Sequence, residues 1–259
     1  MQRFTDLSEI DWIKHGVAKA SPETLGTVSR LIPPIYPAYV KIFHPLYEDL
    51  TVEDMQLTWH DHAKLFRQPT SSEQQDAVGT ILSNSTMVYG GPTSESQLVR
   101  LRWRALCSAL GMPYAPTLSV WSFTRYFVGG SWPKRLIGPE EGTLASLISV
   151  LRRHTPVGPC FFHLWLLATE DMEDLVFRGT LDEAATFPDK IPDARLTPTH
   201  WFPEDHSWLV CSDYDLTFTL VGGSESLAQD LMDSQLLECV RVHPDTRIDS
   251  HADVPEPSD

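Results

Sequence analysis

The sequence has no long hydrophobic run, few cysteines and few basic residues relative to acidic ones. Its longest apolar runs, such as residues 160–168, are about half of the roughly 20 residues that a membrane-spanning helix needs. The N-terminal stretch MQRFTDLSEIDW includes acids and contains no apolar core followed by small residues, so it does not resemble a signal peptide. We therefore expect a cytoplasmic protein that has no membrane partner.

The four cysteines are too few and too widely spaced for a disulfide framework in a chain of 259 residues. Each of them lies inside an apolar run, and none has a second cysteine close by in sequence. They are Cys107, Cys160, Cys211 and Cys239. Because cysteine behaves as a small hydrophobic residue in a core, we expect four buried free thiols.

Metal ligands at close spacing are equally scarce. His60 and His62 flank Asp61 and would share a face on a strand, whereas on a helix they would point about 200° apart. Zinc sites are built from close pairs of Cys or His residues, and no third ligand can be placed near this one. We therefore expect no metal and no cofactor.

Acidic residues dominate the charge, because 35 Asp plus Glu residues against 20 Lys plus Arg residues give a formal net charge of −15. A surface this negative repels phosphate backbones and anionic membranes, so we expect no nucleic-acid partner. It suits a basic protein partner. The same charge would also keep a protein soluble without any partner.

The rest of the composition is that of an ordinary globular protein, with 42% hydrophobic and 21% charged residues. A chain of this length can bury a substantial core. We predict a single α+β domain over residues 1–250, with a helix-rich part at 1–155 and a mainly antiparallel, sheet-rich part at 156–250. We expect residues 251–259 to form a frayed acidic tail.

Periodicity and capping residues place the helices and strands. The expected helices cover residues 5–19, a segment opened by the capping box Ser94–Gln97 and closed by Gly111, residues 140–154, and a short segment capped by Ser224. We expect Leu98 and Leu101 on the buried side of the second of these helices. The expected strands cover residues 40–44, 118–128, 160–168, 207–222 and 236–242.

The run from Trp208 to Leu220 has apolar residues at nearly every even position, which predicts a strand with one buried face. On this basis Phe218 is expected in the core and Thr219 on the exposed side. A turn near residues 212–215 with an odd number of extra residues would move half of the run to the opposite face.

Several residues have both a catalytic or binding interpretation and a purely structural one. Asp213 and Asp215 would face the same way on a strand and could serve acid–base or cation-binding work, although Asp also favours turns. Arg125 is the one charge in an aromatic run, where it would stack on rings, pair with an acid or lie at an exposed edge. Gly222 and Gly223 end a predicted strand before a helix, but they lack the spacing and the lysine of a phosphate-binding loop.

Two stretches of the chain carry a resemblance to other proteins. One is Pro33-Pro34-Ile35-Tyr36-Pro37-Ala38-Tyr39 followed by His44-Pro45, and the other runs from Trp201-Phe202-Pro203 through Asp213-Tyr214-Asp215 to Val221-Gly222-Gly223. Together they resemble a group of bacterial proteins of unassigned activity, common in actinobacteria. The resemblance implies a bacterial origin and a cytosolic setting, and it transfers no catalytic residue. In acidity and α+β layout the chain is also similar to immunity proteins of bacterial toxin systems.

The sequence contains no nucleophile elbow and no cysteine beside a base, so we expect a non-catalytic binding protein. One form of this function is an immunity-type inhibitor of a basic toxin or nuclease. The alternative is an enzyme or small-molecule binder whose site is assembled from residues distant in sequence. The candidate binding residues are Tyr36, Tyr39, His44, Arg125, Trp201, His206, Asp213 and Asp215. We expect the segment 182–201 to be a lid or a long connection.

Overall fold

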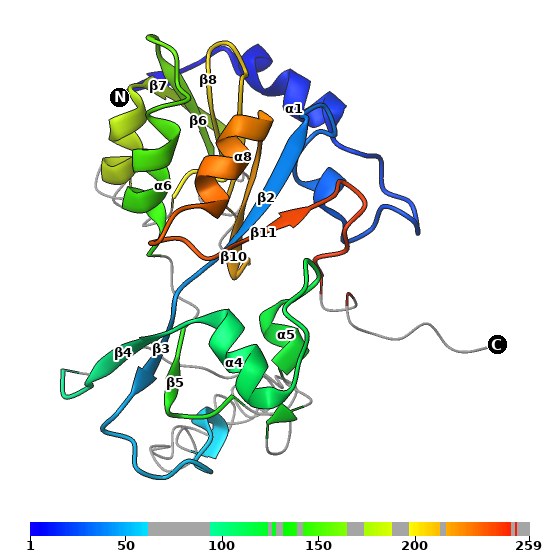
Figure 1. Ribbon diagram of the computed structural model, residues 1–259. Helices are drawn as coiled ribbons and strands as arrows, with labels where there is room; N and C mark the ends of the chain where they lie inside the picture. The colour runs from blue at the N-terminus through cyan, green and yellow to red at the C-terminus, as the bar shows by residue number, and fades with distance from the viewer. Residues whose placement is uncertain are drawn as a thin grey trace, which may run out of the picture. The chain divides into compact units, whose positions relative to one another are not determined.

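The computed structural model in Figure 1 describes residues 1–61, 94–123, 126–127, 132–138, 142–164, 174–187, 197–212, 216–249 and 252. Contacts within the chain gather into two compact units, a division that the sequence did not predict. The larger unit contains Met1–His44, Ala115–Thr117 and Glu141–Asp259, and the smaller one contains Pro45–Tyr114 and Leu118–Glu140. No helix among the described residues is long and apolar enough to cross a membrane.

The larger unit is built around one eight-stranded sheet in which all neighbouring strands run antiparallel. In spatial order its strands are β1 (Gln2–Phe4), β7 (Leu175–Gly179), β6 (Cys160–Leu164), β8 (His200–Pro203), β9 (Leu209–Cys211), β10 (Phe218–Gly223), β2 (Ala38–Phe43) and β11 (Cys239–Val242). The predicted α+β class is confirmed. Strand β2 comes from the part of the chain that was expected to be rich in helix, so the sheet is not confined to the C-terminal part.

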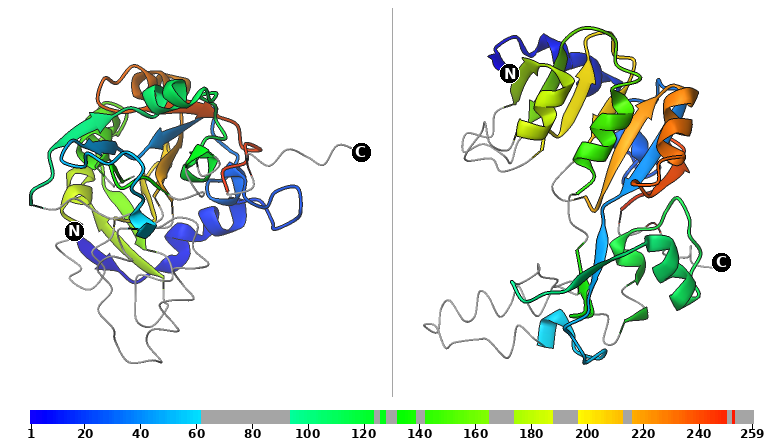
Figure 2. Two further views of the ribbon diagram at one scale, coloured as in Figure 1. Left: turned by 90° about the horizontal axis from the view of Figure 1, so that it is seen from below. Right: turned by 60° about the vertical axis from the view of Figure 1, so that its left-hand side comes forward.

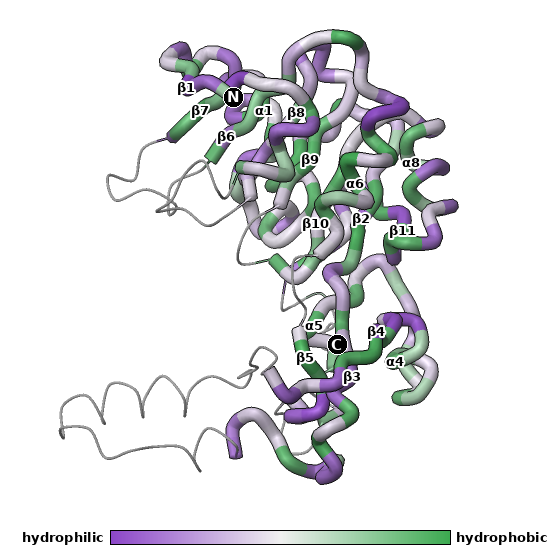
Figure 3. The backbone as a smooth tube through the Cα atoms, turned by 90° about the vertical axis from the view of Figure 1, so that its left-hand side faces the viewer, coloured by the Kyte–Doolittle hydropathy of each residue, from purple (hydrophilic) through white to green (hydrophobic). Residues whose placement is uncertain are grey.

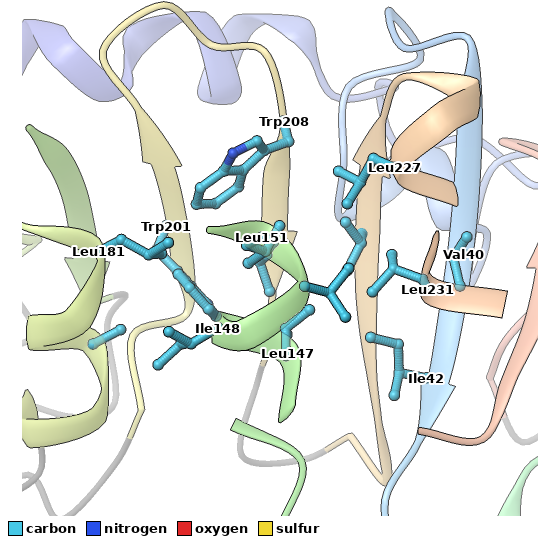
Figure 4. Close-up of a cluster of buried hydrophobic side chains, with 14 of the residues drawn as sticks. Val40, Ile42, Leu147, Ile148, Leu151, Leu181, Trp201, Trp208, Leu227 and Leu231 are labelled. Atoms are coloured by element: carbon cyan, nitrogen blue, oxygen red, sulfur yellow. The ribbon is translucent and has the colours of Figure 1, made fainter. Parts of the chain in front are cut away.

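Both faces of this sheet are covered. On one face lie α6 (Leu144–Leu151), the short 3₁₀ helix η6 (Leu181–Thr186) and α8 (Glu225–Met232), whose apolar residues form one core cluster with the sheet (Figures 2 and 4). On the other face lie η1 (Leu7–Ile10), α1 (Asp11–Gly16) and η2 (Val28–Arg30), which form a second cluster. Figure 3 shows hydrophobic residues along the central strands, as expected for strands buried on two sides.

The best-predicted elements are those with a clear period or cap. Ser224 caps α8 by accepting a hydrogen bond from the backbone N–H of Leu227 at 3.2 Å, and Leu227 and Leu231 face the sheet. Helix α6 buries four residues on the same cluster. Strands β2, β6 and β11 lie within or overlap the predicted ranges.

The apolar residues at even positions between Trp208 and Leu220 do not all lie on the same face of the sheet. Leu220 lies opposite Cys211, and Val221 lies opposite Val210. Val210 therefore joins the α6–α8 cluster, whereas Leu220 joins the α1 cluster on the other side. The parity switches between β9 and β10, as an odd-length turn would require. Because both faces are covered, Thr219 is buried, and the prediction that it would be exposed is wrong.

Strand β10 continues through both glycines that were expected to end it. A Cβ atom at Gly222 would come within 2.5 Å of the Tyr36 ring, and one at Gly223 within 2.7 Å of Leu227 Cδ2. These two side chains approach the strand from opposite faces. The glycines therefore provide room for close packing on both sides of the sheet rather than a break in it.

The smaller unit contains a three-stranded antiparallel sheet in the order β4 (Leu98–Leu101), β3 (Leu46–Asp49) and β5 (Leu136–Ile137), with helices α4 (Trp103–Leu110) and α5 (Val120–Phe123). The predicted helix from Ser94 is wrong in its first part, because residues 98–101 form β4. The backbone N–H of Gln97 donates to the Asp49 carboxylate at 3.1 Å, which draws this segment against β3. The predicted end of the helix is correct, since Gly111 follows α4 with a left-handed backbone, φ of 67°.

The prediction of a strand over residues 118–128 is also wrong where the structure describes it. Residues 120–123 form the single helical turn α5. The backbone N–H of Ser119 donates to Ser122 Oγ at 2.9 Å, which is one half of a capping arrangement and favours the helical turn over an extended chain. The apolar and aromatic composition of this segment reflects burial rather than strand structure.

Candidate functional site

The candidate binding residues fall in different places. Arg125, Asp213 and Asp215 lie outside the described residues. Five others belong to the larger unit, where they occupy three separate surroundings: Tyr36, Tyr39, His44, Trp201 and His206. Only Tyr36 and His206 lie near a common exposed surface.

That surface surrounds the tight turn between β8 and β9. His206 adopts a left-handed backbone with φ of 55°, and its N–H donates to the Pro203 carbonyl at 2.9 Å. The Asp205 carboxylate accepts a hydrogen bond from the Ser207 N–H at 3.0 Å, an Asx turn that fixes the same loop. We call the surface formed by Glu9, Trp12, Tyr36, Asp205 and His206 the turn surface.

Aromatic rings from two distant parts of the chain meet here. Trp12 of α1 stacks on the His206 ring with centroids 4.4 Å apart and lies edge-on to Phe202 at 5.1 Å. Among the residues that the structure describes, no acceptor reaches the buried Trp12 Nε1. The sequence singled out His206, but it presented Trp12 only as an apolar position of a helix.

The two tyrosines of the Pro-rich segment have different roles. The Tyr39 hydroxyl donates to the Pro33 carbonyl at 2.9 Å and accepts from the Tyr36 N–H at 2.8 Å, so it holds the segment in shape. The Tyr36 ring packs over Gly222, and its hydroxyl is buried without a partner among the described residues. Burial, followed by the neighbouring Tyr39 and Asp205, raises the pKa of Tyr36 well above its ordinary value. The Tyr36 side chain is therefore a neutral phenol at pH 7, with its hydroxyl turned into the protein.

The charge around the turn surface is negative. Asp205 is exposed, and Glu9 is half-buried. Burial lowers the pKa of His206, against the opposing effect of Glu9 and Asp205, so its ring is predominantly neutral at pH 7. Carboxylates next to neutral aromatic faces attract cations through Coulomb and cation–π interactions. The turn surface is therefore suited chemically to a Lys or Arg side chain.

His44 lies in a buried polar cluster that the sequence did not reveal. Its Nε2 is 3.0 Å from Thr219 Oγ1, which is 3.2 Å from Ser212 Oγ. Burial lowers the pKa of His44 to about 4, so the imidazole is neutral at pH 7. All three side chains are buried, which gives the cluster a structural role inside the sheet.

Trp201 is a core residue. Its side chain is 1% exposed and packs edge-on against Trp208 with centroids 5.7 Å apart (Figure 4). Among the described residues, nothing accepts a hydrogen bond from its Nε1. Trp208, by contrast, donates to Thr155 Oγ1 at 3.2 Å.

A chain of ionisable side chains that sequence reasoning missed lies on the α1 face of the sheet. His163 and His200 are directly opposite each other on β6 and β8, and their Nδ1 atoms are 3.3 Å apart. His163 Nε2 is 2.9 Å from the Asp174 carboxylate, which also pairs with Lys14 of α1. The only signal in the sequence was a single histidine, His163, inside an apolar run; His200 follows a Thr-Pro-Thr stretch and carries no such signal.

Within the described ranges, no group of three or more His, Cys, Asp or Glu side chains lies close enough together to hold a metal ion. Of the two histidines that flank Asp61, His62 lies outside those ranges. All four cysteines are buried and free, which confirms the prediction of buried thiols.

Comparisons of the chain with protein-family models, curated proteins and solved structures gave no match. The function is therefore argued from the site alone.

Proposed function

We propose that this protein acts by binding a basic protein partner, without catalysis, and that the turn surface receives a cationic side chain of that partner. The observation that carries the proposal is the exposed Asp205 beside the stacked rings of Trp12 and His206. The net charge of −15 supports it, because a strongly acidic protein attracts a basic partner over long range and speeds association.

The surroundings of the other candidates favour binding over chemistry. Tyr39 and His44 are engaged in buried hydrogen bonds, and Trp201 is enclosed by apolar side chains. None of these three presents a reactive atom to solvent. In contrast, the turn surface is rigid, because a left-handed residue and an Asx turn fix its loop, and a rigid surface loses little entropy on binding.

The proposed partner class is a basic toxin or nuclease, for which this protein would serve as an immunity-type inhibitor. This class is suggested by the acidity and by the similarity in layout to immunity proteins. Where such a toxin is encoded beside this protein, its product is the first partner to test. A cation–π contact and an adjacent charge pair would together contribute on the order of 1–2 kcal/mol at this surface.

The test compares two variants that remove the same charge. Asp205→Asn keeps the oxygen that accepts from Ser207 and removes the negative charge from the turn surface. Asp245→Asn removes another exposed charge elsewhere, where the carboxylate is 3.3 Å from His243 Nδ1. Binding is measured by calorimetry against the basic protein encoded next to this one and against an Arg-rich peptide.

We expect Asp205→Asn to weaken binding about 5- to 10-fold, which corresponds to about 1 kcal/mol. Asp245→Asn should change it less than twofold. Trp12→Ala should weaken binding at least as much as Asp205→Asn. Equal effects of the two Asp variants would mean that only overall charge matters, and an absence of binding to either probe would exclude the proposal.

The chain Lys14–Asp174–His163–His200 favours a second candidate function, an enzyme whose site is assembled from residues distant in sequence. A carboxylate next to an imidazole is a common general acid–base arrangement. Both imidazoles are less than 5% exposed, however, and this burial makes binding the preferred proposal. Hydrolysis of a generic ester or phosphodiester that is lost in His163→Gln would reverse the preference.

A further inference from the structure

The hydrogen bonds of His163 and His200 need more hydrogens than two neutral imidazole rings supply. His200 Nε2 is 3.0 Å from the Leu31 carbonyl oxygen, which can only accept, so this nitrogen carries a hydrogen when the bond is made. His163 Nε2 faces the Asp174 carboxylate at 2.9 Å and must also donate. One more hydrogen is then required between the two Nδ1 atoms, which are 3.3 Å apart.

Two neutral imidazoles carry one hydrogen each, so they can make only two of these three bonds. If His163 donates to Asp174 and His200 donates to Leu31, two lone pairs face each other between the rings. If His163 instead donates to His200, its bare Nε2 faces the carboxylate. Every neutral assignment leaves at least one contact between two acceptors, whereas one additional proton satisfies all three bonds.

The charged groups around the pair come from several elements. Asp174, just before β7, accepts from His163 and also pairs with Lys14 of α1. The segment after η2 contributes only the Leu31 carbonyl to the described contacts of His200. On β9 the residue opposite His200 is the buried thiol Cys211. Asp174 favours an added proton on the pair, and Lys14 disfavours it.

We propose that His163 and His200 form a proton-sharing pair that binds one proton between their Nδ1 atoms, and that this proton completes a hydrogen-bonded chain from α1 through the sheet to the segment after η2. The pair is then a pH-responsive element. Its protonation strengthens the hydrogen bond from His200 on β8 to the Leu31 carbonyl after η2 and the contact of His163 on β6 with the Asp174 carboxylate. The proposal concerns the free protein and does not depend on the proposed partner.

Burial sets the range in which this occurs. It lowers the pKa of both imidazoles, that of His200 to about 3, although for His163 the hydrogen bond and charge of Asp174 oppose the decrease. Near pH 7 the pair is therefore neutral and one proton short. Acidification is expected to add a single proton to the pair, on the His163 side, at a pH below the ordinary histidine value.

The test is a pH titration of the full chain, followed by the ¹⁵N shifts of the histidine rings. The wild-type rings of His163 and His200 should change together through a single transition. His154, which pairs with Asp230 at 2.7 Å, provides an internal control. Its ring shifts should be the same in the wild type and in variants at the pair.

Two variants should move the transition in opposite directions. Asp174→Asn can donate to His163 Nε2, which completes the chain with neutral rings, so the transition should shift down by about 1 pH unit or more. Lys14→Gln removes a disfavouring charge and should shift it upward by a smaller amount, because the Lys14 side chain is 42% exposed. Separate midpoints for the two rings, rings that stay neutral until the protein unfolds, or shifts of the same sign in both variants would overturn the proposal.

Discussion

The two adjacent tryptophans Trp201 and Trp208 allow a direct test of the packing on the α6–α8 face. Both side chains are at most 1% exposed, and they contact each other edge-on (Figure 4). They differ in one respect. Trp208 Nε1 donates to Thr155 Oγ1, whereas Trp201 Nε1 has no acceptor among the described residues. Replacing each by Phe removes the same atoms and the same indole N–H.

The expected difference follows from hydrogen bonding alone. The volume lost is the same in Trp201→Phe and Trp208→Phe, so the cavity contributions largely cancel in the comparison. Trp208→Phe also loses a hydrogen bond worth about 1 kcal/mol. Trp201→Phe removes a buried unsatisfied donor and regains about 1–3 kcal/mol of desolvation cost. Trp201→Phe should therefore be less destabilising than Trp208→Phe by roughly 2 kcal/mol or more.

Unfolding in urea, followed by far-UV circular dichroism, measures both free energies. Thr155→Val is the matched control, because it removes the acceptor of Trp208 and leaves Trp201 untouched. Because Thr155 Oγ1 also donates to the Leu151 carbonyl at 2.7 Å, this variant should destabilise both backgrounds, and the wild type more than Trp208→Phe by about 1 kcal/mol. If Trp201→Phe costs as much as Trp208→Phe, then Trp201 Nε1 has a partner, and the reasoning from its unsatisfied donor is refuted.

Three further predictions address other parts of the chain. The four buried cysteines should react negligibly with a thiol reagent in the native protein and fully after denaturation, and rapid native labelling of any one would contradict their burial. Burial lowers the pKa of His44 to about 4, so on acidification the unfolded chain binds a proton at this residue before the folded protein does. The free energy of unfolding should therefore fall by about 2 kcal/mol between pH 7 and pH 5 because of His44. Urea unfolding at both pH values should show a smaller loss in His44→Gln. Asp49→Ala should destabilise the smaller unit by about 3 kcal/mol in thermal unfolding, because the carboxylate accepts hydrogen bonds from Thr51 N, Thr51 Oγ1 and Gln97 N. Thr51→Val removes one of these bonds and should cost about 1 kcal/mol.

Local patterns in the sequence predicted the elements whose determinants are themselves local. The leucine spacing of α6 and the Ser224 cap of α8 lie within eight or nine residues, so they could be recognised without knowledge of any partner. The buried thiols followed from apolar neighbours in the same way. The helix expected after Ser94 failed because its beginning is decided by Asp49, a residue 48 positions from Gln97.

The candidate site depended on contacts that no local pattern carries. Trp12 stacks on His206 because α1 packs on the face of the sheet next to the turn that follows β8. His163 lies opposite His200 because β6 pairs with β8. A sequence can mark such residues as unusual, as it marked His206. Only the strand order decides which of them become neighbours.

The covering of the sheet on both faces also explains which candidates keep a functional interpretation. In a strand with one solvated face, half of the side chains are available for binding, and the prediction for Thr219 assumed such a strand. With helices on both faces, side chains on the strands become core residues, as Tyr39 and Trp201 are. Available surface is then left mainly where strands end, and binding residues are commonly found on loops held by a rigid scaffold. His206, in the β8–β9 turn, lies at such a position, and for this reason we place the proposed binding function there rather than on the strands.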